Sequence, residues 1–107
     1  MTIKKLSAMP YAQAHIEISE DGDIALFSYT TLVAYIDREG WCGCNGTYSQ
    51  TTRKHISAFA KEYAAPLDYY SFKKAYEGGY VINHHTGEVL DYGTYATSAS
   101  ERGGYNV

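Results

Sequence analysis

Two cysteines and two adjacent histidines are the residues of this chain that best match the ligand types of a zinc site. Cys42 and Cys44 are separated by one residue, so on a strand their sulfur atoms point to the same face. His84 and His85 lie in a later loop and carry two imidazole groups. A Cys-x-Cys pair is tighter than the usual zinc-finger spacing, however, and only one of two adjacent histidines can easily reach the same ion. We therefore expect no cofactor, and zinc held by these residues is the alternative.

His55 is the side chain that could act as a general base, and it follows three hydroxyl residues, Ser49, Thr51 and Thr52. A general base needs a nucleophile or an acidic group within hydrogen-bond distance, and the sequence locates neither for His55. Helix capping explains the hydroxyl groups. The chain also has no phosphate-binding glycine loop, no pair of catalytic carboxylates and no nucleophile elbow. We expect a structural histidine and a protein that is not an enzyme.

Five basic residues are expected on the exposed sides of two helices, where they could contact phosphates or an acidic protein surface. These residues are Arg53, Lys54, Lys61, Lys73 and Lys74. The first two lie near the positive end of the main helix dipole, where basic side chains slightly destabilise a helix. That placement favours recruitment for binding, although a solvated helix face explains the same residues.

Acidic residues surround one predicted hairpin turn, whose Asp-Gly pair is a strong turn signal. They are Glu17, Glu20, Asp21 and Asp23. Such a cluster often only keeps a turn soluble, but it can also steer a protein toward the basic groove of an enzyme that handles nucleic acid. The net charge of −3 gives the chain as a whole no basic field that would attract nucleic acid.

Tyrosine is unusually frequent: the chain has 12 tyrosines, against three phenylalanines and one tryptophan. Tyrosine combines a large contact area with a polar tip and a low entropy cost, so it is favoured at binding surfaces. The same residue also serves as a half-buried strand residue. Because a chain of 107 residues has one modest core, we expect some of these rings to be exposed.

The segment from Trp41 to Tyr63 organises the predicted fold, because it changes from an extended strand into an amphipathic helix. Apolar residues with helical spacing start at Ile56 and end at Tyr63, and the helix is expected to stop before Pro66. A second, shorter helix is expected over 69–77, with Asp68 as its N-cap and two glycines at its end. Strands are predicted over residues 13–19, 24–29, 32–37, 41–48, 80–83 and 88–92.

This order of elements predicts an α+β fold: an antiparallel sheet with one main amphipathic helix and a second short helix packed on it, and a closing β-hairpin. We expect a loose arm over residues 1–10, a single domain over 1–92 and a flexible tail over 93–107. No apolar run is long enough to cross a membrane, and the first residues do not form a signal peptide, so we expect a cytoplasmic protein.

Two blocks, FSYTTLVAYID (27–37) and TYSQTTRKHISAF (47–59), resemble a family of small phage and prophage proteins. Those proteins have a strand that ends in SY-x-T and then YS-x-TT-x-x-H leading into a helix. The resemblance covers the middle third of the chain and implies an origin in a mobile element and the cytoplasm of a bacterial host. In size, tyrosine content and mild acidity the chain is also similar to anti-CRISPR inhibitors, which bind RNA-guided nucleases stoichiometrically.

We therefore expect a phage-type binding protein that inhibits a bacterial defence nuclease by protein–protein occlusion. Its partner would be an RNA-guided nuclease or another host defence protein, with no membrane partner. The expected partner-binding residues are Glu20, Asp21, Asp23, Tyr29, Tyr35, Tyr69 and Tyr70. The alternatives are a nucleic-acid-binding accessory protein of a mobile element, which would use the basic residues above, and a small structural zinc-binding module.

Overall fold

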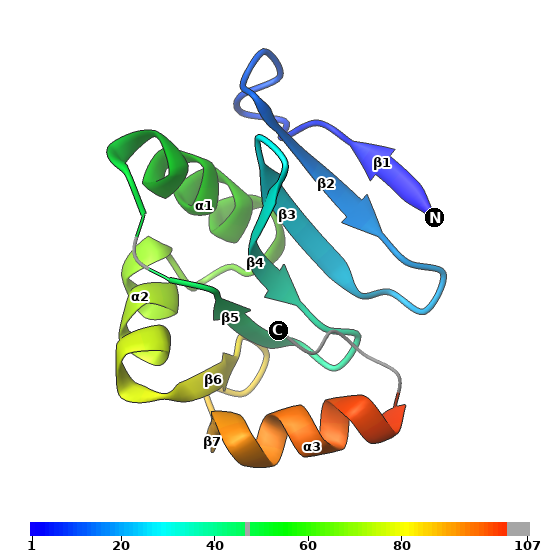
Figure 1. Ribbon diagram of the computed structural model, residues 1–107, viewed down its shortest axis with the longest axis vertical. Coiled ribbons are helices and arrows are strands. Elements are labelled where there is room, and N and C mark those ends of the chain that lie inside the picture. The colour runs from blue at the N-terminus through cyan, green and yellow to red at the C-terminus, as the bar shows by residue number, and fades with distance from the viewer. Residues whose placement is uncertain (47, 103–107) are drawn as a thin grey trace.

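The computed structural model describes residues 1–46 and 48–102, in which a seven-stranded antiparallel sheet follows the order of the sequence (Figure 1). The strands are β1 (Thr2–Lys4), β2 (Ala14–Ile18), β3 (Ile24–Ser28), β4 (Thr31–Ile36), β5 (Trp41–Cys44), β6 (Tyr80–Asn83) and β7 (Val89–Asp91). The helices are α1 (Gln50–Tyr63), α2 (Tyr69–Gly78) and α3 (Tyr92–Arg102). The predicted α+β fold is confirmed. Thr47 and the predicted tail residues 103–107 lie outside the described residues.

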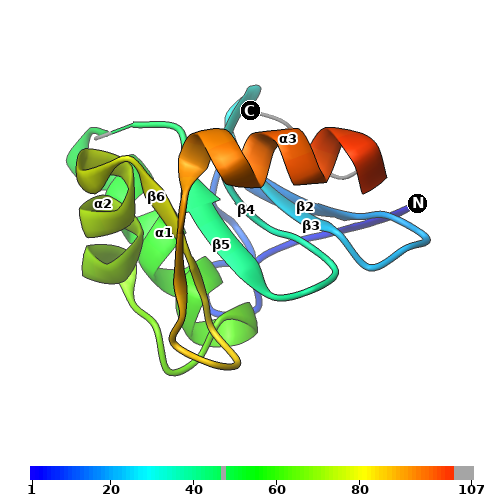
Figure 2. The same cartoon turned by 90° about the horizontal axis from the view of Figure 1, so that it is seen from below.

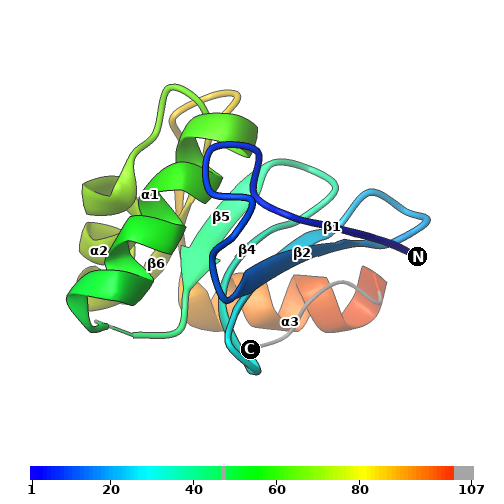
Figure 3. The ribbon, with the colours of Figure 1, turned by 90° about the horizontal axis from the view of Figure 1, so that it is seen from above.

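The three helices lie on opposite faces of the sheet, with α1 and α2 on one side and α3 on the other (Figures 2 and 3). Strand pairing sets which residues reach each face. Ile16 of β2 pairs with Leu26 of β3, Leu26 with Ala34, and Ala34 with Cys44. All four side chains are buried in the cluster that α1 and α2 cover. Because side chains alternate along a strand, Tyr35, which follows Ala34 in β4, points to the opposite face and packs with Tyr95 of α3.

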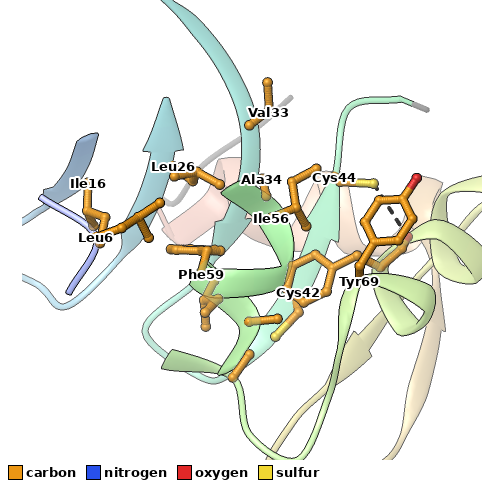
Figure 4. Packing of buried hydrophobic residues seen from close by; sticks show 14 of the residues in the cluster. Leu6, Ile16, Leu26, Val33, Ala34, Cys42, Cys44, Ile56, Phe59 and Tyr69 are labelled. Carbon is orange, nitrogen blue, oxygen red and sulfur yellow. Dashed lines mark hydrogen bonds between the residues drawn. The ribbon is translucent and has the colours of Figure 1, made fainter. Parts of the chain in front are cut away.

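The main core forms where α1 and α2 pack on the sheet (Figure 4). Ile56, Phe59 and Ala60 of α1 are fully buried, at the helical spacing that the sequence predicted. Phe72 of α2 is also fully buried, with its ring centroid 6.4 Å from that of Phe59. One apolar stripe from each helix thus meets the same face of the sheet. None of the described helices combines the length and the apolar composition needed to cross a membrane.

Local capping fixes where the two main helices begin and end, as predicted. The Ser49 hydroxyl accepts a hydrogen bond from the Thr52 N–H, 3.4 Å away, at the start of α1. Asp68 and Ser71 form a reciprocal capping box at the start of α2. Gly79 then ends α2 with φ 74°, a left-handed conformation that glycine adopts without steric cost. The chain is thereby turned directly into β6.

The predicted loose arm contains an edge strand instead. Thr2 of β1 pairs with Ile18, so the first residues extend the sheet beyond β2. Leu6 is fully buried in the main core, and both the N–H and the hydroxyl of Ser7 donate to the Glu62 carboxylate, at 2.9 and 2.7 Å. A strand of three exposed residues is too short to show a periodic pattern in the sequence. The burial of Leu6 and the hydrogen bonds from Ser7 to Glu62 hold the segment against α1.

Residues 93–102 of the predicted flexible tail belong instead to helix α3. Tyr95 is only 1% exposed, and its ring is stacked on Tyr35 with centroids 6.2 Å apart. Tyr35 itself lies over Gly43, where an added Cβ would collide with the Tyr35 hydroxyl. A glycine in β5 therefore makes room for the first tyrosine, and the first tyrosine supports the second.

This packing predicts that Tyr95→Ala destabilises the fold. Removing a fully buried ring leaves a cavity, and we expect the free energy of unfolding to fall by about 3 kcal/mol. Urea unfolding followed by circular dichroism measures the change. Tyr11→Ala is the matched control, because Tyr11 is 98% exposed, and it should change stability by less than about 0.5 kcal/mol. If both variants unfold at the wild-type urea concentration, α3 does not pack as described.

Candidate functional site

A chain of polar side chains, buried at Ser28, Thr52 and His55, joins the end of β3 to the first turns of α1. The Ser28 hydroxyl lies 2.9 Å from Nδ1 of His55 and 3.2 Å from the Thr52 hydroxyl. The Ser49 hydroxyl donates to the Thr52 hydroxyl across 3.4 Å. Ser28, Thr52 and His55 are 3%, 8% and 2% exposed, respectively. The Ser-Tyr block around Ser28 and the hydroxyl-rich block before His55, which are separate in sequence, therefore meet at one polar cluster.

His55 is neutral in this setting, because burial lowers its pKa from the ordinary value. An uncharged imidazole can share one hydrogen bond with the Ser28 hydroxyl through Nδ1. The pairing of a serine hydroxyl with an imidazole also matches the spacing of a nucleophile and a base. Both groups lie beneath the surface, however, which favours a structural role. Sequence reasoning missed Ser28 as the partner of His55.

Tyr29 follows Ser28 directly and occupies an unusual backbone conformation. Ser28 pairs with Thr31, so Tyr29 and Thr30 form a tight turn, in which Tyr29 has φ 57°. Among the described residues it is the one non-glycine residue with positive φ. The ring is 57% exposed, and its centroid lies 6.4 Å from that of His55. An aromatic side chain is thus held at the surface by a turn that would favour glycine or asparagine.

One residue of the predicted acidic cluster, Asp23, is buried in an ion pair with the half-buried Arg38. Asp23 is 4% exposed, and Arg38 donates to its carboxylate from the backbone N–H, from Nε and from Nη2, the last at 2.7 Å. The assignment of Asp23 as a surface contact is therefore wrong. Glu20 and Asp21 remain exposed, although Asp21 also approaches Arg38, at 3.6 Å. Sequence reasoning missed Arg38, whose turn lies beside the acidic hairpin because β3 and β4 are antiparallel neighbours.

Of the four tyrosines predicted to contact a partner, two are buried and two are exposed. Tyr35 and Tyr69 are 1% and 6% exposed, so their assignment as surface contacts is corrected. Tyr35 points to the α3 side of the sheet, and Tyr69 starts α2 on the face that packs against the core. Tyr29 and Tyr70 are 57% and 65% exposed and remain available for a partner.

A shallow groove of about 270 Å³ lies beside the first turns of α1 and α2. Arg53 and Lys54 line it together with Tyr69 and Tyr70. The Arg53 guanidinium carbon lies 6.0 Å from the centroid of the Tyr69 ring, within the range of a cation–π contact. Only two of the five basic residues of the sequence analysis line this groove. Lys61, Lys73 and Lys74 do not line it.

The cysteines and histidines considered for zinc are engaged in other contacts. The Cys42 thiol lies 3.3 Å from the Gly40 carbonyl oxygen, and burial raises its pKa to about 12. The Cys44 thiol donates toward the carbonyl oxygen of Phe72, 3.4 Å away. The His84 and His85 rings lie 4.0 Å apart. Within residues 1–46 and 48–102, no group of three or more His, Cys, Asp or Glu side chains is arranged to hold a metal ion.

Comparison with known proteins identifies one family. Residues 2–76, more than two thirds of the chain, match a family of unknown function (DUF8033). No curated protein and no solved structure matches the chain. The polar cluster at Ser28 and His55, the Tyr29 turn and the basic groove all lie within the matched range. The strands β6 and β7 and the helix α3 lie beyond it.

Burial of His55 predicts a loss of stability in mild acid. The unfolded chain takes up a proton on this residue near pH 6.5, whereas the folded protein does so only at lower pH. The unfolded state therefore binds more protons below about pH 7, and the free energy of unfolding decreases as the pH falls toward about 5. In His55→Gln this decrease should be smaller than in the wild type, as measured by urea unfolding at several pH values. Tyr11→Ala, which removes an almost fully exposed side chain, should keep the wild-type slope. Identical slopes in the wild type and in His55→Gln would contradict the assignment.

The ion pair between Asp23 and Arg38 predicts a second stability effect. Asp23→Asn removes the buried charge that three Arg38 donors share, and the free energy of unfolding should fall by about 2 kcal/mol. Asp21→Asn is the control, because its side chain is 69% exposed and its contact is longer, so its effect should stay below about 0.5 kcal/mol. Thermal or urea unfolding at pH 7 measures both. If Asp23→Asn lowers the free energy of unfolding by no more than about 0.5 kcal/mol, as expected for Asp21→Asn, the pair is not important for stability.

Proposed function

We propose that this protein, which belongs to the DUF8033 family, is a binding protein that inhibits a partner protein by covering part of its surface. The main support for the proposal is the way in which a fixed turn exposes the Tyr29 ring at the surface. Its ring is largely exposed, its backbone is in the left-handed region, and the residue before it is fixed in the polar cluster by His55 and Thr52.

The left-handed turn at Tyr29 suits other residue types better than tyrosine. A left-handed conformation costs a residue with a Cβ on the order of 1 kcal/mol, whereas glycine avoids that cost and asparagine tolerates the conformation. A ring that is 57% exposed recovers only part of this cost through burial. Strained residues that stay exposed cluster at sites that bind other molecules. The rigid turn also lowers the entropy cost of placing an aromatic anchor at an interface.

The partner that we propose is a bacterial RNA-guided nuclease, with another host defence protein as the broader class. The support is the resemblance of the two sequence blocks to phage and prophage proteins; His55 and Ser28, which belong to these blocks, hold the Tyr29 turn in place. Location in the cytoplasm of a bacterial host is part of the same proposal. Inhibition of this kind requires only binding and no chemical reaction on the partner.

The acidic hairpin has a smaller part in the proposal than the sequence suggested. Glu20 and Asp21 precede β3, whereas Tyr29 follows it, so the two features lie at opposite ends of a five-residue strand, roughly 17 Å apart. An interface of standard size can include both ends. Exposed charges at its rim act mainly on the rate of association, and the aromatic anchor contributes more to affinity.

The basic groove favours a second candidate function, binding of single-stranded nucleic acid. Arg53 and Lys54 can contact phosphates, while the exposed Tyr70 ring at the groove offers a surface on which a base can stack. Binding of this kind must weaken as salt is added, because bound phosphates release counterions. Protein–protein occlusion need not show that dependence, so titration of an oligonucleotide at two salt concentrations separates the two functions.

For the main proposal we predict that Tyr29→Asn separates stability from inhibition. Asparagine tolerates the left-handed turn, so the free energy of unfolding should stay within about 0.5 kcal/mol of the wild type or increase. Loss of the aromatic anchor should weaken binding to the nuclease by about tenfold or more. The measurements are urea unfolding, pull-down of purified RNA-guided nucleases and inhibition of their DNA cleavage.

Tyr11→Ala is the control for these measurements, because Tyr11 is more exposed than Tyr29 but has an ordinary backbone. It should bind and inhibit like the wild type. If the wild-type protein neither binds nor inhibits any nuclease tested, the partner class is wrong. If Tyr29→Asn inhibits as well as the wild type, the proposed contact is wrong even where inhibition occurs.

A further inference from the structure

A cavity of about 330 Å³ lies where the end of α2 meets β5, β6 and the start of α3. Four tyrosines line it, Tyr35, Tyr76, Tyr80 and Tyr92. They come from four different elements: β4, α2, β6 and α3. This concentration of aromatic side chains lies outside the polar cluster and the basic groove. Its volume is at the lower end of the range for small-molecule sites, so it suits a small ligand.

Close packing against glycine helps to shape the cavity. Tyr35 lies over Gly43, which also lines the cavity, and a Cβ at this position would collide with the tyrosine hydroxyl. Gly79 lines it at the end of α2, where no atom lies within 4 Å of an added Cβ. The Tyr35 ring therefore approaches bare backbone at Gly43, and open space remains beside Gly79.

The electrostatic environment of the cavity favours a positive charge. The last residues of α2 line it, and the C-terminal end of a helix carries partial negative charge. The last turn of α2 contains no basic residue that would offset this charge. Lys73 and Lys74 of the same helix do not line it.

We propose that this cavity binds a small organic cation that carries an alkylammonium group. Aromatic rings attract such cations through their electron-rich faces, and ammonium groups enclosed by several rings are bound in this way. The partial negative charge at the end of α2 adds attraction for the same charge and opposes the binding of an anion. The inference stands on the cavity alone and does not depend on the proposed nuclease partner.

The experiment compares choline with 3,3-dimethylbutan-1-ol, in which carbon replaces the charged nitrogen. Both ligands have nearly the same shape, so a difference in affinity reports the charge. Titration of the full chain, followed by calorimetry and by NMR of the protein, should show choline binding at least threefold to tenfold more tightly than the alcohol. Equal affinities would show a merely apolar cavity and overturn the proposal, as would the absence of choline binding at millimolar concentrations.

Variants of Tyr76 locate the binding site, because its side chain is 46% exposed and its replacement should leave the fold intact. Tyr76→Leu keeps an apolar wall but removes a ring, so the affinity for choline should fall severalfold toward that for the alcohol. Tyr76→Phe keeps the ring and should bind choline like the wild type. Tyr70→Leu is the matched control on the same helix, since Tyr70 lines the other groove. Loss of affinity in Tyr70→Leu but not in Tyr76→Leu would place the cation elsewhere and overturn the assignment.

Discussion

The fold depends on the packing of α1 on the sheet, and this packing requires an uncharged, hydrogen-bonded histidine. His55 lies next to Ile56 on the buried side of α1, where a charged imidazole would lose its solvation without gaining an opposite charge. The Ser28 hydroxyl supplies the hydrogen bond that a buried ring needs. Because Ser28 is the last residue of β3, the same bond also fixes where this strand ends relative to the helix. This contact therefore connects the end of β3 directly to the first turns of α1.

From this contact the antiparallel order of the strands determines what each end of the sheet presents. The turn at Tyr29 and the start of α1 lie at one end of β3. The hairpins that contain Asp23 and Arg38 lie at the other end, where they are joined by an ion pair. Each end thus combines a polar contact that stabilises the fold with exposed residues, Tyr29 at one end and Glu20 at the other.

The elements with strong local signals could be predicted from the sequence, and those that depend on distant partners could not. The stripe around Ile56 and the caps at Ser49 and Asp68 predicted α1 and α2, because both signals lie within a few residues. Helix α3 has no such stripe, and its contact is Tyr95 stacking on a ring from β4. Tyrosine gives no signal of its own burial, since its ring suits a core and its hydroxyl suits water. The burial of Asp23 likewise depends on Arg38, a partner from another hairpin.

The range matched by the family model includes one of the two features proposed to bind other molecules in full and the other only in part. The matched range, residues 2–76, includes both residues of the pair between Ser28 and His55 and the exposed turn that this pair supports. The tyrosine-lined cavity needs Tyr80 and Tyr92 as well, which lie beyond that range. The matched range therefore includes the whole polar cluster and the Tyr29 turn, but only part of the lining of the cavity. The Tyr29 turn is built entirely from the part of the chain that the family model matches, whereas β6 and α3 complete the cavity.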